Sequence, residues 1–160
     1  MTKSRIRKTS PRRIAIGFSI AAVFILNGCL PAAEFAPADP ATAEAHLDRG
    51  LGFLQARDFK SAKLELSAAR PFQTGDTRAL MGLAIAADME GDFRTADRAY
   101  AALMTRGVNQ AQLFNNMGYS YMLRGDLVQA AAYLAEAARR APEDPTIRNN
   151  LAMLKKVAPL

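Results

Sequence analysis

The sequence predicts an all-α fold, an α-solenoid of three helix pairs followed by a C-terminal capping helix. Three alanines, Ala62, Ala96 and Ala130, lie 34 residues apart. No segment alternates apolar and polar residues as a half-buried strand does. The tripeptides at the start of each second helix also recur, as Arg57-Asp58-Phe59, Gly91-Asp92-Phe93 and Gly125-Asp126-Leu127. A period of 34 is the length of a helix–turn–helix repeat, and chains built in this way usually bind other proteins.

Residues 1–28 have the pattern of a secretory signal peptide. Six basic residues precede an apolar run from Ile14 to Leu26, and the first acid of the chain is Glu34. The run is 13 residues long, whereas a membrane-spanning helix needs about 20. We therefore predict that this segment is removed on export, with a permanent inner-membrane span as the alternative.

The apolar run ends in Leu26-Asn27-Gly28-Cys29, which resembles the bacterial lipobox. The resemblance implies cleavage between Gly28 and Cys29 and acylation of the Cys29 thiol, a lone cysteine in an ordinary signal peptide being the alternative. Two or three acyl chains give stable membrane anchoring. Leu30, rather than Asp, follows the cysteine. We expect a lipid-anchored protein of the bacterial cell envelope, on the periplasmic face of the outer membrane.

Residues 29–42 are expected to form an extended tether behind the acylated cysteine. Pro31, Pro37 and Pro40 stand among alanines there, and proline fixes φ and removes a backbone donor. Residues 43–160 are then one domain, with repeats at 43–76, 77–110 and 111–144 and a capping helix at 145–156.

Local signals place seven helices, at about 41–55, 58–70, 76–89, 92–105, 110–123, 126–139 and 145–156. Asp58, Asp92 and Asp126 are expected to be N-cap acceptors at the second helix of each unit. Gly91 and Gly125 suit the left-handed residue that ends a helix. Because Arg57 stands in place of that glycine in the first unit, its turn should be strained or differently shaped. Asp144-Pro145 should begin the last helix.

The repeat resembles the tetratricopeptide repeat, or TPR. Counting from Ala43, Thr77 and Ala111, the eighth place is small, the twentieth is alanine, and the twenty-fourth is large. Those residues are Gly50, Ala84 and Gly118, the three alanines above, and Leu66, Tyr100 and Leu134. The resemblance implies that the first helices of the units line a concave, protein-binding surface.

Charge and side-chain chemistry exclude several classes of function. The net charge of +6 comes from six basic residues before residue 14, and 15 basic and 15 acidic residues remain after them, so no field steers a nucleic acid. With one histidine, His46, and one cysteine, the chain lacks a metal-binding cluster of the usual spacing. No phosphate loop or nucleophile motif occurs. We predict a non-enzymatic protein with no cofactor and no small-molecule substrate.

The candidate site is the concave surface, which should take a protein or an extended peptide. Methionine adapts to varied partner shapes, and asparagine can pair with a peptide backbone. The groove residues implied by the TPR register are Leu51, Met81, Ile85, Asn115, Asn116, Tyr119, Met122, Asn149 and Asn150. The alternative for the asparagine pairs is that they cap or bridge helices.

Three short motifs make the chain most similar to the TPR lipoprotein of Tad (Flp) pilus assembly systems. They are Asn115-Asn116-Met117-Gly118-Tyr119-Ser120, then Arg124-Gly125-Asp126, then Asn149-Asn150-Leu151-Ala152. That resemblance implies an adaptor or assembly factor whose partner is a secretin or another pilus component. The rivals are a TPR pilotin of a type IV pilus, an adaptor for cell-wall enzymes, and a structural subunit of an outer-membrane assembly complex that uses its convex face.

Overall fold

The computed structural model describes residues 38–108 and 110–158, and within them every regular element is a helix. The expected signal peptide at 1–28, Cys29 and residues 29–37 of the expected tether lie outside the described residues. Among the described helices, none combines the length and apolar character needed to cross a bilayer.

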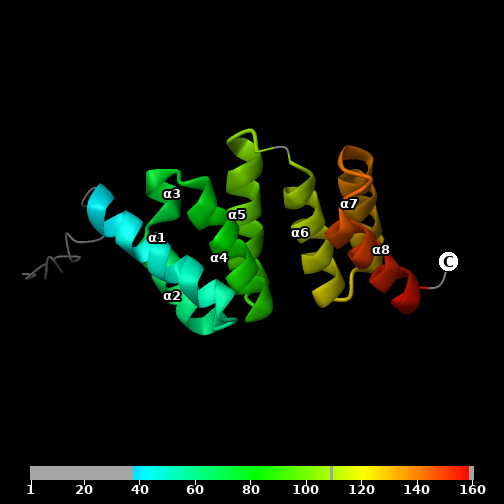
Figure 1. Cartoon of the computed structure of the whole chain (residues 1–160), viewed down its shortest axis with the longest axis horizontal. Coiled ribbons are helices and arrows are strands. Elements are labelled where there is room, and N and C mark those ends of the chain that lie inside the picture. The colour runs from blue at the N-terminus through cyan, green and yellow to red at the C-terminus, as the bar shows by residue number, and fades with distance from the viewer. Residues whose placement is uncertain (1–37, 109, 159–160) are drawn as a thin grey trace, which may run out of the picture. The chain divides into compact units, whose positions relative to one another are not determined.

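Three antiparallel helix pairs and a final helix follow one another along the chain (Figure 1). The pairs are α1 with α2, α4 with α5, and α6 with α7, and α8 packs on α7; a short α3 joins the first two pairs. The bounds are α1 Pro40–Gln55, α2 Phe59–Ala68, α3 Pro71–Thr74, α4 Thr77–Met89, α5 Phe93–Thr105, α6 Ala111–Leu123, α7 Leu127–Arg140 and α8 Pro145–Val157. The predicted α-solenoid of three TPR pairs and a capping helix is confirmed.

The helix starts have the predicted local cause. Asp58, Asp92 and Asp126 each accept a hydrogen bond from the backbone N–H three residues on, at 3.1, 3.2 and 3.0 Å. Asp144 accepts from the backbone N–H groups two and three residues on, those of Thr146 and Ile147, and Pro145 lies in the first turn. These carboxylates satisfy amides that the helix leaves without a partner.

The turns inside the units show why the first one is different. Gly91 and Gly125 have φ values of 71° and 80°, in the left-handed region that glycine adopts without a Cβ penalty. Arg57 occupies the same place with φ 60°. The predicted strain at Arg57 is therefore present, and such a conformation costs a residue with a Cβ about 1–2 kcal/mol.

The structure refines two expected helix bounds. Helix α1 begins at Pro40, one residue before the expected start at about 41, and Asp39 caps it by accepting the N–H of Thr42 at 3.0 Å. The expected helix 58–70 ends at Ala68, and Arg70 adopts a left-handed φ of 52° before Pro71 starts α3. Since a proline disfavours helical backbone at the residue before it, the chain breaks there and restarts.

The core of each pair is built on the small residues that set the register. Ala62, Ala96 and Ala130 are fully buried. A Cβ added to Gly118 would lie 2.6 Å from Cγ of Leu134, and one added to Gly50 would come equally close to the first unit's leucine at that place. The paired helices therefore approach more closely than a larger side chain would permit.

Candidate functional site

The first helices of the three units, α1, α4 and α6, and the capping helix α8 form the candidate surface, and two of the hollows between them contain predicted groove residues. The hollow between α4 and α6, the α4–α6 hollow, has a volume of about 100 Å³. It is lined by Ile85, Asp88, Met89, Tyr100, Asn116 and Tyr119. The hollow between α6 and α8, the α6–α8 hollow, measures about 260 Å³ and is lined by Gln112, Asn115, Asn116, Asp144, Thr146 and Ile147.

Three of the predicted groove residues meet in the α4–α6 hollow. Ile85, Asn116 and Tyr119 are half-buried there, so each offers surface to a partner. Met81 joins them, because Asn116 Nδ2 donates to Met81 Sδ at 3.3 Å. Asn116 also lines the α6–α8 hollow, and its side chain therefore separates the two.

Asn115 and Asn150 are engaged with each other. Asn150 Nδ2 donates to Asn115 Oδ1 at 2.9 Å, and the two residues are 7% and 4% exposed, respectively. The amides therefore bridge α6 and α8, the alternative that the sequence left open for these asparagines. A buried amide without such a bond would be costly.

The remaining predicted residues do not gather at the hollows. Leu51 packs against the core of the first unit, and Met122 packs against the core shared by α7 and α8. Asn149 is exposed, with its Nδ2 3.9 Å from Met153 Sδ. The predicted groove residues that lie together are therefore Met81, Ile85, Asn116 and Tyr119, on α4 and α6.

Asp88 is the important residue that the sequence analysis missed. It is 6% exposed at the α4–α6 hollow and accepts hydrogen bonds from Tyr100 Oη at 2.8 Å and Ser120 Oγ at 2.5 Å. Arg124 Nη2 lies 3.7 Å from the same carboxylate and donates to Ser120 Oγ at 2.6 Å. Burial raises the pKa of Asp88 above its ordinary value, against the lowering effect of these hydrogen bonds and of Arg124. The network ties the second unit to the third, and two of its members, Asp88 and Tyr100, line the α4–α6 hollow.

A signal for Asp88 was present in the repeat. The twelfth place of the units holds Leu54, Asp88 and Met122, so an acid replaces an apolar residue in the middle unit. Its partners, Tyr100 and Ser120, lie 12 and 32 residues away along the chain. The sequence could therefore indicate that position 88 is unusual, but not which residues bind its carboxylate.

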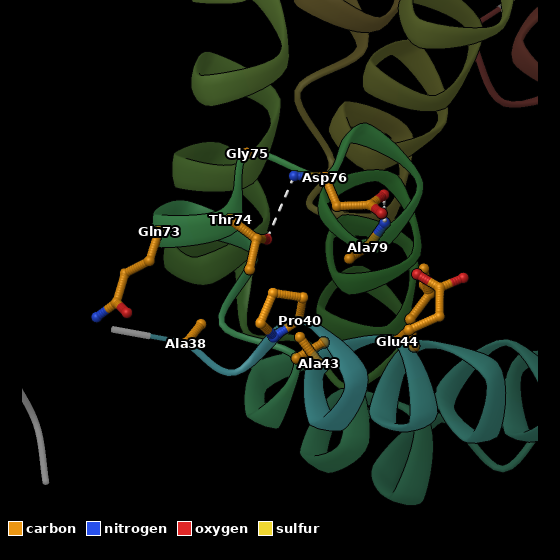
Figure 2. A pocket seen from close by; sticks show the side chains of 11 residues that line it. Ala38, Pro40, Ala43, Glu44, Gln73, Thr74, Gly75, Asp76 and Ala79 are labelled. Atoms are coloured by element: carbon orange, nitrogen blue, oxygen red, sulfur yellow. Dashed lines mark hydrogen bonds between the residues drawn. The ribbon is translucent and has the colours of Figure 1, made fainter. Parts of the chain in front are cut away.

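A larger hollow of about 580 Å³ lies beside the short α3, between α1 and the start of α4 (Figure 2). Pro40 and Ala43 of α1 face it, with Glu44 at its rim. Near it, Arg78 pairs with Asp76 at 2.8 Å and with Glu44 at 3.0 Å. These pairs raise the pKa of Arg78 and engage the guanidinium, so it is not a free anion clamp.

Within the described residues, no group of three His, Cys, Asp or Glu side chains is placed to hold a metal ion. His46 is half-buried, with its Nδ1 2.8 Å from Glu65 Oε2.

Comparison with known proteins bears on the fold. No family model and no curated protein matches the chain. Among solved structures, the chain is similar to PilF of Pseudomonas aeruginosa, a TPR protein, with a TM-score of 0.60 and 24% identity. The match covers 73% of this chain and 54% of PilF, so this chain spans about half of that protein's length. At this identity the likeness supports the TPR fold alone.

Proposed function

We propose that the chain is a TPR lipoprotein, anchored in the outer membrane through Cys29, that acts as a protein-binding adaptor or assembly factor for a Tad/Flp pilus secretion machine. The α4–α6 hollow carries the binding part of this proposal. It combines half-buried apolar and amide side chains with the buried Asp88, which is hydrogen-bonded to Tyr100 and Ser120. Such a surface suits an apolar side chain of a partner segment, with Asn116 available to its backbone.

The anchor and the machine rest on the sequence motifs. The lipobox at Leu26-Asn27-Gly28-Cys29 supports acylation, and the Asn-Asn motifs at 115–116 and 149–150 support the Tad family. The partner is then a secretin or another pilus-assembly component, bound as a folded protein or an extended peptide. The proposal assigns no enzymatic activity.

A second candidate is a pilotin of a type IV pilus. The fold likeness to PilF, a TPR-containing type IV pilus lipoprotein, favours it. Both candidates place a secretin at the α4–α6 hollow, and the genes beside this one on the chromosome would separate the two machines.

The function is tested by replacing Tyr119 with alanine in the native cell and measuring secretin multimers in outer-membrane fractions. The matched control is Met104→Ala, since Met104 is 48% exposed on α5 and lies outside both hollows. Loss of multimers in the Tyr119 variant alone, with the protein still folded and present, is the expected result. Normal multimers in both variants would contradict the proposal.

The anchor is tested separately by Cys29→Ser. The variant should leave the membrane fraction or keep its uncleaved signal peptide, and an unchanged, membrane-bound mature protein would contradict acylation.

A further inference from the structure

We infer a second docking surface on the α7–α8 pair, a groove that takes an amphipathic helix of another protein with acidic residues beside its apolar stripe. This α7–α8 groove has a volume of about 460 Å³ and an almost wholly apolar lining. Its main lining residues are Val128, Ala131, Ala135, Leu151, Leu154 and Lys155. It is separate from the α4–α6 hollow, which the proposed function uses, and from the α6–α8 hollow, and it shares no lining residue with either.

The repeat provides an internal comparison at the eighteenth place of each unit. That place holds Lys60 in the first unit, Arg94 in the second and Val128 in the third. Val128 is 79% exposed. The place that holds a charged, solvated side chain in the first two units therefore holds an exposed apolar side chain in the third.

The twenty-first place shows the same change. Lys63 pairs with Asp92 of the following unit at 3.4 Å, and Asp97 pairs with Arg124 of the following unit at 2.9 Å. In the third unit this place is Ala131, which forms part of the apolar lining. The contacts that cover the earlier boundaries between units are replaced here by an open apolar surface.

The geometry of the groove suits a helix. The α7 lining residues recur every fourth position, from Leu127 through Ala131 to Ala135, over two turns or about 12 Å. Leu151 and Leu154 form the opposite wall from α8. The two alanines let a third backbone come close, as in helix-in-groove recognition.

Charge identifies the occupant. Lys155 is the only charged residue lining the groove, and within the described residues no acid pairs with it or with Lys156. The acid of α7, Glu136, is already paired with two arginines, one of them Arg140 at 2.5 Å. A second copy packed through the same groove would add a second Lys155 and, from the lining residues, no acid. An acidic partner helix satisfies these lysines, and a concave groove fits a helix better than a flat membrane surface.

The test uses the full chain in phosphatidylcholine nanodiscs and two synthetic amphipathic helices with one apolar stripe, flanked by glutamates in one and by lysines in the other. Because the chain has no tryptophan, a tryptophan in each peptide reports binding by fluorescence. The glutamate peptide should bind roughly tenfold more tightly than the lysine peptide. Val128→Gln, which removes apolar surface at an exposed place without adding a charge, should weaken it roughly tenfold. Lys155→Glu should weaken binding of the glutamate peptide about fivefold and strengthen binding of the lysine peptide.

Arg94→Ala, at the same place on α5, is the matched control and should change neither affinity. Failure of both peptides to bind at about 1 mM, equal binding of the two, or indifference to Val128→Gln would overturn the inference. Self-association of the chain that Val128→Gln abolishes would assign the groove to a second copy, and binding to phosphatidylglycerol vesicles that it abolishes would assign the groove to a membrane. Either result would also overturn the inference.

Discussion

Replacing Asp88 with alanine should lower the free energy of unfolding by about 2–4 kcal/mol. The substitution removes the acceptor of two hydrogen bonds, from Tyr100 and Ser120, and bonds to a charged group contribute about 1.5–3 kcal/mol each. Against this loss, the variant no longer buries a carboxylate whose pKa burial has raised. The net effect is therefore smaller than the sum of the two bonds.

The assay is chemical and thermal denaturation followed by circular dichroism at 222 nm, a helix signal. For a domain of this size, 1 kcal/mol shifts Tm by about 4 °C, so the expected fall is about 8–16 °C. Because the network joins the second unit to the third, the transition should also broaden as the two halves of the repeat array unfold less cooperatively. A loss below about 0.5 kcal/mol with an unchanged transition width would refute the reasoning, since the desolvation cost would then equal the hydrogen-bond gain.

Three further predictions concern pH, the close approach of α6 and α7, and the turn at Arg57. The stability advantage of the wild type over Asp88→Asn should fall as pH rises from 3.8 through the raised pKa of Asp88 in the folded state, because the folded state binds the proton of this carboxyl more tightly than the unfolded state does. Denaturation at a series of pH values measures this advantage, and an advantage that rises with pH would contradict the prediction. Gly118→Ala should destabilise the protein by about 1–3 kcal/mol, because the new Cβ would meet Leu134. Gly52→Ala, with nothing within 4 Å of the new Cβ, should stabilise α1 by about 0.5–1 kcal/mol. Equal effects of the two variants on Tm would be inconsistent with the close approach of α6 and α7. Arg57→Gly should stabilise by about 1 kcal/mol by relieving the left-handed strain, and a lower Tm would show that the arginine is not strained there.

Features set by neighbouring residues could be predicted from the sequence. Asp92 and Gly91 act within one turn of their own positions, so their cap and left-handed roles follow from residue type and register. The strain at Arg57 follows in the same way, from comparison with the two glycine-containing turns. The packing of small eighth-place residues against large twenty-fourth-place residues follows from the 34-residue period.

Features set by distant residues could not be predicted. Helix α3 has four residues, too few to show a helical period, and only Pro71 marks its start. The Asn115–Asn150 bridge spans 35 residues, and a repeated Asn-Asn motif fits a peptide-binding amide as well as an internal hydrogen bond. The α7–α8 groove depends on which faces of the two helices remain uncovered after packing. In the sequence, Val128 therefore cannot be told apart from an apolar residue that is buried on its helix.

The predicted groove residues divide for the same reason. The TPR register places nine residues on one surface, but side-chain packing decides which of them lie at a common hollow. Ile85, Asn116 and Tyr119 do so, whereas Leu51 and Met122, which are also half-buried, pack against separate cores.

Photo-crosslinking in the native cell from a reactive residue at position 119, with mass-spectrometric identification of the captured protein, tests the central claim most directly. Position 104 on α5 is the control, because its side chain is exposed away from the α4–α6 hollow. The account predicts that a secretin or another pilus-assembly component is captured from position 119 and not from position 104. Capture of that protein from position 104 alone, or of a peptidoglycan enzyme from position 119, would contradict it.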